Sequence, residues 1–558
     1  MTETLNGAQL TVRLLERQGV RIVSGYPGGA ILPIYDALGQ STVIHHVLAR
    51  HEQGAGFIAQ GMARATGQAG VCLASSGHGA TNLLTAIADA KLDSIPLVAI
   101  TGQVPQAMIG TDAFQEVDTY GLTVPITKHN FLVSSAEELL EVIPRAFEIA
   151  LSGRPGPVLI DIPKDVQTQA IAVTHWPAPG QARKPDAPDA ARLAEAAAMI
   201  RAAERPLLYL GGGVVHGGAA GLALALAEKA NLPTVMTLMA LGAMPVDHPL
   251  SLGMLGMHGA PYCNLALDEC DLLIAIGARF DDRATGKVAA FCPQAKIIHI
   301  DIDPAELDKI KTAQVGLVAD VSDALQALLP LVDENPRSAW VDRIRQLKNE
   351  HPQRFPDVEQ PLSHFGLIRE VAASLDDEAI IATDVGQHQM WVAQAYPLRR
   401  ARQWLTSGGL GTMGFGVPAA IGAALAEPRR TVVCFTGDGS ILMNIQELVT
   451  AGEENVNLKI VLMNNATLGL VHQQQTLFYG ERLFASQFKA MPDFVRVAQA
   501  LGIAAIDLDQ ADDPVTALRD ALSRPGPCLI HARIDAEQKV YPMVPPGAAN
   551  RDMIGASA

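Results

Sequence analysis

Several features are scarce or missing in this chain of 558 residues, and each shortage narrows what it can be. Aromatic residues make up 5% of the sequence, so Ala, Val, Leu and Ile must fill most of its cores. No apolar run is long enough to cross a bilayer, and the N-terminal stretch carries acidic residues early, without an apolar signal core. We therefore expect a cytoplasmic protein that does not interact with membranes.

Cysteine spacing and charge exclude further classes of protein. The six cysteines stand singly, without CxxC spacing, so neither a disulfide framework nor a zinc site is expected, and buried reduced thiols are the simpler interpretation. The net charge is −16 and no long basic run is present, so nucleic acid is not an expected partner.

What the sequence does contain is a repeated local pattern. Short runs of Val, Ile and Leu, as at 70–74, 206–210 and 432–436, each lead through a Gly-containing turn to a longer helical stretch. Such alternation predicts an α/β protein whose parallel sheets are doubly wound, with helices on both faces and ligands at the carboxyl ends of the strands. The stretch 170–190 lacks apolar periodicity and predicts a linker, and a second seam, 333–361, joins a short charged helix to Pro-broken coil. The expected domains are 1–170, 190–332 and 362–545.

A candidate metal site lies in the third block. TVVCFTGDGS places Asp438 between two glycines directly after an apolar strand, and LKIVLMNN brings Asn464 and Asn465 to the end of the next strand. A carboxylate and an amide oxygen from adjacent strand ends are hard oxygen ligands suited to Mg²⁺ and a diphosphate. The glycines let backbone N–H groups approach the phosphates.

This pattern resembles the signature of thiamine-diphosphate enzymes. The resemblance implies that Asp438, Asn465 and the backbone carbonyl of Thr467 hold Mg²⁺. DVGQHQMW and SGGLGTMGFG match further cofactor contacts of that family. The cofactor residues implied are Gln387, His388, Met413, Gly437, Gly439, Ser440 and Asn465. From spacing alone, Met413 would be ordinary core packing.

A carboxylate in the first block is the candidate proton exchanger. Glu52 begins an expected helix whose remaining face is small or apolar, in LARHEQGAGFIAQGMARATG. Such surroundings disfavour the ionised form of a carboxyl, which suits a group that exchanges a proton near neutral pH. A helix-start Glu that only complements the helix dipole is the alternative. RHEQGA resembles the setting of the Glu that hydrogen-bonds N1′ of the aminopyrimidine in thiamine enzymes, and we choose Glu52 as the catalytic base.

Three loops of the same block complete the expected catalytic set. GYPGGA, GTDAFQE and DIPKD carry candidates which the resemblance places around the reacting carbon or at the pocket mouth: Gly29, Phe114, Gln115 and Lys164. Taken alone, Phe114 would be core and Lys164 a solvated charge. The chain reads SSGHGATN where the family has SGPGATN, so His78 adds a titratable donor beside the expected cofactor pocket.

The middle block has no GxGxxG, yet glycines and acidic residues follow its expected strands in GGG, GARFDDR and HIDID. An adenine dinucleotide needs such groups for its phosphates and ribose hydroxyls, although a Rossmann-like core without a ligand is an equal alternative. The elements resemble the FAD site of the acetohydroxyacid synthase (acetolactate synthase) catalytic subunits, whose FAD does not turn over. The FAD residues implied are Arg154, Gly211, Gly212, Gly213, Thr237, Leu238, Gly256, Met257, His258, Gly277, Arg279, Asp281, Arg283, Asp301, Ile302, Asp320 and Val321.

The resemblance extends from about residue 6 to residue 550. It implies decarboxylation of pyruvate and transfer of a two-carbon unit to a second pyruvate or to 2-ketobutyrate, in the first common step of valine, leucine and isoleucine biosynthesis. Arg283 is expected to grip the ketoacid carboxylate, with Met254 and Gln474 beside it. Many family members have Trp at position 474. One methylene in an apolar pocket is worth roughly 1–3 kcal/mol, so Gln474 predicts little preference between the two acceptors.

Two alternatives remain open at this point. An FAD-containing thiamine-dependent pyruvate oxidase or decarboxylase would share most motifs, although Arg283 and Lys164 favour a second ketoacid over oxygen. A non-catalytic cofactor-binding homologue would explain His78 but not the intact Glu52, Asp438 and Asn465. The resemblance also implies a homodimer or homotetramer with shared active sites, and a small regulatory subunit that carries feedback by branched-chain amino acids.

Overall fold

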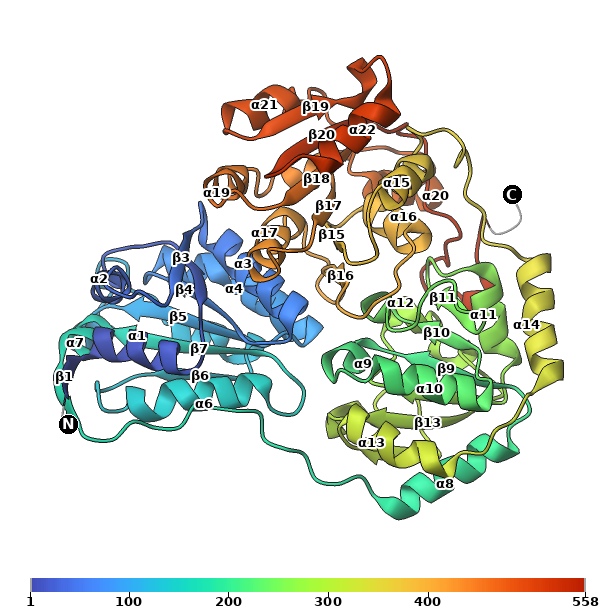
Figure 1. Cartoon of the computed structure of the whole chain (residues 1–558), viewed down its shortest axis with the longest axis horizontal. Coiled ribbons are helices and arrows are strands. Elements are labelled where there is room, and N and C mark those ends of the chain that lie inside the picture. The colour runs from blue at the N-terminus through green and yellow to red at the C-terminus, as the bar shows by residue number, and fades with distance from the viewer. Residues whose placement is uncertain (1–2, 556–558) are drawn as a thin grey trace.

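The computed structural model describes residues 3–555 and contains three six-stranded sheets, each fully parallel. In Figure 1 the first sheet lies in the blue and cyan part of the chain, the second in the green part and the third in the orange and red part. The predicted fold class is confirmed. The six cysteines are buried and unpaired, as expected. No helix within 3–555 combines the length and apolarity needed to span a bilayer.

The first sheet has the strand order β3-β2-β4-β5-β7-β6. Its strands are β2 (Ile22–Gly25), β3 (His45–Leu48), β4 (Gly70–Ala74), β5 (Leu97–Gln103), β6 (His129–Leu132) and β7 (Pro157–Pro163). Its helices are α1 (Gly7–Arg17), α2 (Leu32–Leu38), α3 (Glu52–Thr66), α4 (His78–Asp93), α5 (Thr119–Thr123), α6 (Leu139–Leu151) and α7 (Lys164–Thr168). Strands β4, β5 and β7 are buried along their whole length, which is why their sequences are near-continuous apolar runs.

The start of the first predicted linker is a strand instead. β8 (Ala170–Val173) pairs antiparallel with β1 (Glu3–Asn6). Ile171 and Val173 are buried while Ala170 and Ala172 are exposed, so this segment follows the alternation of a half-buried strand. The expectation of a linker over 170–190 was therefore wrong for its first four residues.

The middle sheet has the order β11-β10-β9-β12-β13-β14. Its strands are β9 (Pro206–Leu210), β10 (Thr234–Met236), β11 (Ser251–Met254), β12 (Leu272–Ile276), β13 (Lys296–Asp301) and β14 (Val315–Val318). Its helices are α8 (Ala190–Ala202), α9 (Gly212–His216), α10 (Ala220–Ala230), α11 (Pro261–Glu269), α12 (Asp282–Thr285) and α13 (Val321–Leu328). Numbered along the chain, this order is 3-2-1-4-5-6, the order of dinucleotide-binding folds.

The third sheet has the order β16-β15-β17-β18-β20-β19. Its strands are β15 (Ile380–Thr383), β16 (Trp404–Leu405), β17 (Val432–Gly437), β18 (Leu458–Asn464), β19 (Ala504–Asp507) and β20 (Cys528–Arg533). Its helices are α15 (His364–Ala373), α16 (Gln387–Ala395), α17 (Gly416–Ala426), α18 (Asp438–Ile441), α19 (Glu447–Glu453), α20 (Gly469–Phe478), α21 (Phe494–Ala500) and α22 (Pro514–Ser523). Numbered along the chain, the first and third sheets share one order, 2-1-3-4-6-5.

Glycines let the first and third sheets approach each other through α3 and α17. A Cβ on Gly61 would lie 1.9 Å from the carbonyl oxygen of Ala419, and a Cβ on Gly422 would lie 1.9 Å from that of Ile58. The two helices therefore touch backbone to backbone. This contact fixes the start of α3, where Glu52 lies, relative to the segment that leads into α17.

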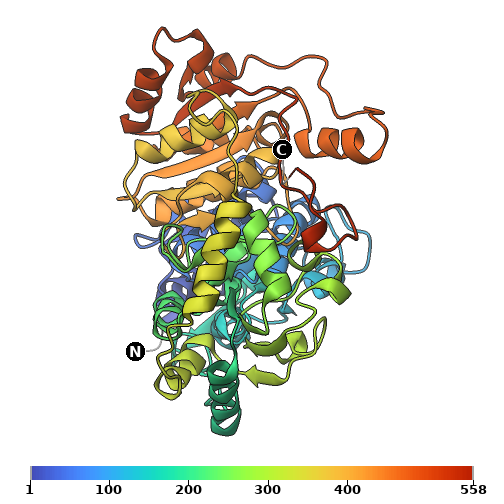
Figure 2. The ribbon, with the colours of Figure 1, turned by 90° about the vertical axis from the view of Figure 1, so that its right-hand side faces the viewer.

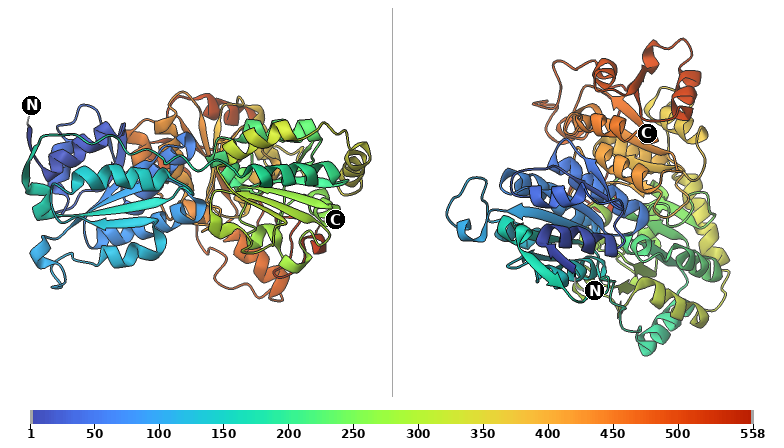
Figure 3. Two further views of the ribbon diagram at one scale, coloured as in Figure 1. Left: turned by 90° about the horizontal axis from the view of Figure 1, so that it is seen from below. Right: turned by 60° about the vertical axis from the view of Figure 1, so that its left-hand side comes forward.

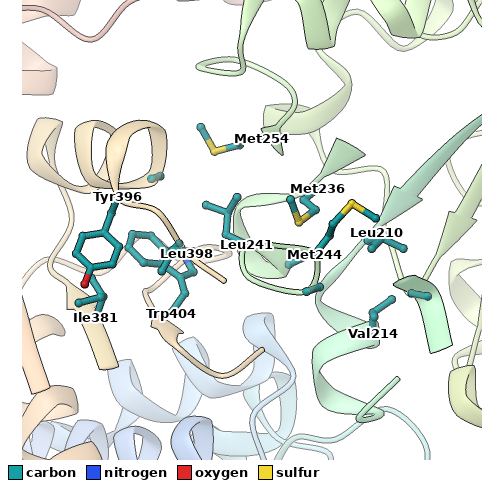
Figure 4. Packing of buried hydrophobic residues seen from close by; sticks show 14 of the residues in the cluster. Leu210, Val214, Met236, Leu241, Met244, Met254, Ile381, Tyr396, Leu398 and Trp404 are labelled. Carbon is teal, nitrogen blue, oxygen red and sulfur yellow. The ribbon is translucent and has the colours of Figure 1, made fainter. Parts of the chain in front are cut away.

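An apolar cluster and the C-terminal tail join the middle and third sheets. Figure 4 shows Leu241 of the middle part directed toward Leu398 and Trp404 of the third part, with Met236 and Met244 on its far side, within one buried cluster. The second linker holds α14 (Ser338–Glu350), the yellow helix that stands in front of the middle part in Figure 2. Beyond β20, the red tail returns to the middle part. There Val544 N–H donates to Met257 and Lys287 N–H donates to Ala548.

Candidate active site

Three neighbouring strands of the third sheet end at one place. β17 lies between β15 and β18, and the register pairs Thr383 with Phe435 and Gly437 with Met463. Because all three strands run in parallel, the residues that follow them gather at the same edge. The structure thus brings together the predicted residues Gln387, His388, Asp438 and Asn465.

Asp438 and His388 are buried at this edge, and each has an atom without a partner. Oδ2 of Asp438 and Nε2 of His388 form no hydrogen bond with any residue in the range 3–555. Burial raises the pKa of Asp438 to about 6, against backbone N–H groups that lower it, and burial lowers the pKa of His388 to about 3. A buried carboxylate oxygen without a partner is suited to bind a cation, and the buried ring nitrogen without a partner is a second polar atom available to a ligand.

The turn after β18 holds the remaining predicted metal ligands. Oδ1 of Asn465 accepts hydrogen bonds from N–H (3.2 Å) and Oγ1 (3.0 Å) of Thr467, and its Nδ2 donates to Oε1 of Gln387 at 3.1 Å. Ala466 between them has φ +54°, a left-handed conformation that disfavours any residue with a Cβ. The turn is therefore held in place by specific hydrogen bonds.

The residues of GDGS pack closely against their neighbours. A Cβ on Gly437 would lie 3.0 Å from the His388 ring, and one on Gly439 would lie 2.8 Å from Leu468 and 3.5 Å from Met413. Ser440 Oγ donates to the Val385 carbonyl at 2.8 Å. Met413, half-buried, thus lies beside the start of α18.

Asp384 is a residue of this edge that the sequence analysis did not single out. It is fully buried, and its carboxylate accepts hydrogen bonds from Gly414 N–H (2.8 Å) and Gly416 N–H (3.2 Å). Burial raises its pKa to about 6. Asp384 therefore fixes the segment on either side of Met413. It belongs to the quoted DVGQH motif, but nothing in its spacing indicated a partner thirty residues away.

In the first sheet, Glu52 begins α3 and is buried, as predicted. Its Oε2 accepts a hydrogen bond from Asn82 Nδ2 at 2.9 Å, and a Cβ on Gly79 would lie 3.4 Å from Oε1. Asn82, one turn into α4, is a second residue that the sequence analysis missed. The GATN motif contains it, and its helical spacing from Gly79 would have placed it on the same face.

The other candidates of the first sheet follow strand ends but are open to solvent. Gly29 follows β2 and is exposed, and Lys164 begins α7 after β7 and is exposed. The segment after β5 forms the light-blue loop that stands away from the body in the right-hand view of Figure 3. On it, Phe114 is 87% exposed and Gln115 is half-buried with φ +59°. His78 is exposed at the first position of α4. A single chain leaves this part of the site uncovered.

A cavity of about 720 Å³ lies at the carboxyl ends of the middle strands. Its volume falls within the range of roughly 300–1,000 Å³ that is usual for ligand sites. The predicted residues that line it are Arg154, Gly211, Gly212, Gly213, Thr237, Leu238, Met257, His258, Gly277, Arg279, Asp281, Arg283, Asp301, Ile302, Asp320 and Val321. Gly256 is the exception, because it packs beneath the backbone of Arg283, whose carbonyl oxygen lies 2.3 Å from the position of its missing Cβ.

The glycines that line this cavity are required for a structural reason that the sequence analysis did not identify. A Cβ on Gly211 would lie 2.0 Å from the Gly277 carbonyl oxygen, and one on Gly277 would lie 2.6 Å from Gly213 Cα. The turns after β9 and β12 thus interlock through their backbones. Glycine is required here for this contact, whatever approaches from the cavity.

Charged residues of the cavity already have partners in the chain. Arg154 pairs with Glu306 at 2.6 Å and with Asp303 at 3.2 Å. Burial raises the pKa of Asp301 to about 6. The side chain of Arg283, by contrast, is 66% exposed and has only long contacts, 3.7 Å to Oδ2 of Asp282 and 3.7 Å to Sδ of Met257, which leaves its guanidinium accessible to a carboxylate.

Met254 and Gln474 both line the same cavity. Met254 belongs to the buried cluster of Figure 4, whereas Gln474 on α20 is exposed. Its neighbour Gln473 is buried and donates to the Val540 carbonyl at 3.0 Å. Gln473 also accepts from Gln387 at 3.2 Å, so α20 connects the cavity to the edge that holds Asp438.

The chain matches three family models that together cover most of its length. They are the N-terminal TPP binding domain (residues 5–122), the central domain (193–328) and the C-terminal TPP binding domain (384–532) of thiamine pyrophosphate enzymes. The acetolactate synthase isozyme 1 large subunit of Escherichia coli (strain K12) is 62% identical over 549 residues, 98% of this chain and 97% of that protein.

Two further relatives match over a similar length. The isozyme 2 large subunit of the same organism is 48% identical over 99% of both chains. Acetolactate synthase 1, chloroplastic, of Oryza sativa subsp. japonica is 47% identical over 99% of this chain and 88% of that protein. The similarity thus spans all three sheets.

Proposed function

We infer the activity of this chain from its family: the chain belongs to the acetolactate synthase large-subunit family of thiamine pyrophosphate enzymes. It is an acetolactate synthase, which decarboxylates pyruvate and joins the two-carbon unit to a second 2-ketoacid, in branched-chain amino acid biosynthesis. The observation that carries this conclusion is the 62% identity to one such subunit over 98% of the chain. We propose the domain bounds 1–170, 190–332 and 362–545, and a cytoplasmic location.

The third domain fits thiamine diphosphate and Mg²⁺. The unpartnered Oδ2 of Asp438 and Nε2 of His388 supply an anionic oxygen for a cation and a ring nitrogen for a phosphate. Asp438, Asn465 and the Thr467 carbonyl would hold the metal, while Gln387, His388, Gly437, Gly439 and Ser440 would hold the diphosphate. When bound, thiamine diphosphate supplies the carbon that adds to pyruvate and accepts the electron pair left by departing CO₂.

The remaining chemistry belongs to the chain's own side chains. Glu52 would move a proton at N1′ of the cofactor, with Asn82 fixing the orientation of its carboxylate. Met413 would support the cofactor from below, in a segment held by Asp384. Gly29, Phe114 and Gln115 would surround the reacting carbon, and Lys164 would stand at the pocket mouth.

The cavity of the middle domain fits FAD in a non-redox role. Its size, its glycine turns and its 3-2-1-4-5-6 strand order support a dinucleotide. Sixteen of the residues proposed for FAD line this cavity, and Gly256 would act through the backbone of Arg283. Arg283 would grip the carboxylate of the acceptor ketoacid.

We propose that Gln474 leaves the acceptor site with little preference between pyruvate and 2-ketobutyrate, because it lacks the apolar surface that would reward an extra methyl group. Met254 would form the opposite wall. The exposure of Phe114 and Gly29 supports a homodimer or homotetramer with shared active sites, in which Glu52 of one chain and Asp438 of its neighbour would hold the two ends of one cofactor. A small regulatory subunit with branched-chain amino acid feedback is the further partner that we propose.

The test is a colorimetric acetolactate assay of the purified chain, with thiamine diphosphate, Mg²⁺ and FAD omitted in turn. We expect acetolactate only with all three, and equally under anaerobic conditions. Bleaching of the flavin by pyruvate would favour an oxidase instead. Products formed without thiamine diphosphate would contradict the proposal.

A further inference from the structure

A buried histidine outside the site, His531, is hydrogen-bonded to the turn that carries the proposed magnesium ligands. His531 lies in β20, and the register of the third sheet places it between Leu462 of β18 and Asp507 of β19. Its side chain is 9% exposed and stacks on Phe494. Neither the motifs nor the proposed function assign it a role.

Both ring nitrogens of His531 have partners within the chain. Nδ1 lies 3.0 Å from Oδ1 of Asp507, and Nε2 lies 3.0 Å from Nδ2 of Asn464. Asn464 is the residue directly before Asn465. A chain of side chains therefore runs from the edge of the sheet to the turn after β18.

The direction of each hydrogen bond in this chain is fixed. Ala466 N–H donates to Oδ1 of Asn464 at 3.1 Å, so the amide of Asn464 must present its Nδ2 donor to His531. Nε2 of His531 therefore accepts, and Nδ1 carries the proton and donates to Asp507. Asp507 selects the tautomer, and the tautomer selects the orientation of the Asn464 amide.

The orientation of that amide bears on the proposed metal ligands. The bond from Asn464 Oδ1 holds Ala466, whose φ of +54° a Cβ-bearing residue does not adopt without support. Ala466 lies between Asn465 and Thr467, which would supply the amide oxygen and the carbonyl oxygen to Mg²⁺. A rotation of the Asn464 amide would release this turn.

We propose that His531, oriented by Asp507, is a positioning residue that sets the geometry of the Asn465–Thr467 turn and thereby the affinity for Mg²⁺. This inference rests on the proposed function. Outer partners of metal ligands typically contribute a factor of about 10–100 in metal affinity. His531 acts through one further residue, so the lower end of that range is expected.

Asp507 and His531, together with the neighbouring Asp509, place potential ligand atoms within 4.8 Å of one another. They nevertheless do not form an open metal site. The two nitrogens of His531 are both used, and Asp509 Oδ2 accepts from Arg533 N–H at 2.9 Å. The backbone N–H of Asp509 donates to Oδ1 of Asp507 at 3.1 Å, but the side chain of Asp509 is not part of the chain of hydrogen bonds. It offers a matched control.

The test is calorimetric titration of Mg²⁺ into the full chain at saturating thiamine diphosphate. We expect His531→Leu to raise the dissociation constant about tenfold, with the melting temperature of the cofactor-free chain near that of the parent. His531→Gln keeps an acceptor and should recover most of the affinity. Asp509→Asn should leave it unchanged.

If His531→Leu does not fold, Asp507→Asn is the deciding variant. The amide of Asn can accept or donate, so it no longer requires the proton of His531 to be on Nδ1. This variant should therefore also weaken Mg²⁺ binding. A dissociation constant within about twofold of the parent in both His531→Leu and Asp507→Asn would overturn the inference. So would equal weakening by Asp509→Asn, which would assign the cluster to ion binding. Absence of Mg²⁺ binding by the parent chain would overturn the proposed metal site itself, a different result.

Discussion

The first and third sheets share one strand order but differ at their strand ends. In the third, buried polar groups from three neighbouring strands converge, and Asp438 and His388 keep unpartnered atoms. In the first, the buried carboxylate of Glu52 is held by Asn82, while Phe114 and Gly29 are open to solvent. With the same topology, the third sheet thus presents a preformed site for ionic groups, whereas the first sheet presents a site that is partly open to solvent. The chemistry of a strand end depends on its residues, and the topology only places them.

The largest expected effect comes from the third sheet. Asp438→Asn removes the only carboxylate proposed for Mg²⁺, which should lower acetolactate formation by about 1,000-fold or more, since a bound metal contributes several kcal/mol. Calorimetry should show no Mg²⁺ uptake at saturating thiamine diphosphate. Normal metal uptake by this variant would remove the distinction between the two sheets.

The next effect comes from the first sheet. Glu52→Gln keeps the shape and the bond to Asn82 but cannot exchange a proton, so activity should fall by about 100- to 10,000-fold. Mg²⁺ binding should stay as in the parent chain, in contrast to Asp438→Asn. Exchange of the thiamine C2 proton, followed by NMR in D₂O, should be lost. Retained exchange would mean that Glu52 is not the base.

The functional residues at the strand ends were predictable from the sequence, but the distant residues that are hydrogen-bonded to this edge were not. Parallel sheets place ligands at carboxyl ends, so an apolar run followed by GDG or NN was enough to find Asp438 and Asn465. The same rule pointed to GGG, GARFDDR and HIDID in the middle domain, without a GxGxxG, and the resemblance supplied the other cavity residues. It also predicted all three sheets.

Residues that act through distant partners escaped the sequence analysis for a physical reason. Asp384 is hydrogen-bonded to Gly414, and His531 to Asn464. These partners are far apart in the sequence, and no local sequence pattern predicts that they come together. Asn82 was within reach, because helical spacing alone relates it to Gly79. The strand β8 was missed because its four residues alternate too briefly beside a Pro-rich stretch to outweigh the linker composition.

An intermediate effect concerns the cavity next to the third sheet. Gln474→Trp adds an aromatic surface beside Met254, so the preference for 2-ketobutyrate over pyruvate as acceptor should rise about 10- to 100-fold. The ratio of the two products in a competition assay measures it. A Gln474→Glu control should not raise the ratio. A strong preference in the parent chain would contradict the role given to Gln474.

The smallest effect concerns a buried carboxyl inside the first sheet and its dependence on pH. Asp161 in β7 is 1% exposed, and burial raises its pKa from 3.8 to about 7, against hydrogen bonds from Thr101 (2.7 Å) and Gln103 (3.0 Å). The folded chain then holds this proton more tightly than the unfolded one. Stability is therefore lost as the pH rises from about 4 to about 7.

The measurement for Asp161 is the melting temperature at pH 5 and at pH 8. The parent should lose more stability over this interval than Asp161→Asn, by about 3 °C, whatever the absolute cost of the substitution. Equal losses in the two proteins would show that Asp161 keeps its charge in the folded state.

The way the chain ends are held has a consequence for unfolding. β1 pairs with β8, and the tail from 541 to 552 is hydrogen-bonded to the middle domain. The first domain is thus a closed loop, whose two ends stay together even when its interior opens, and the end of the third domain is anchored to the middle domain. A closed loop gains less chain entropy on local unfolding than a segment with one free end. Fraying from either terminus is therefore opposed before it reaches Glu52 on one side or Asp438 on the other.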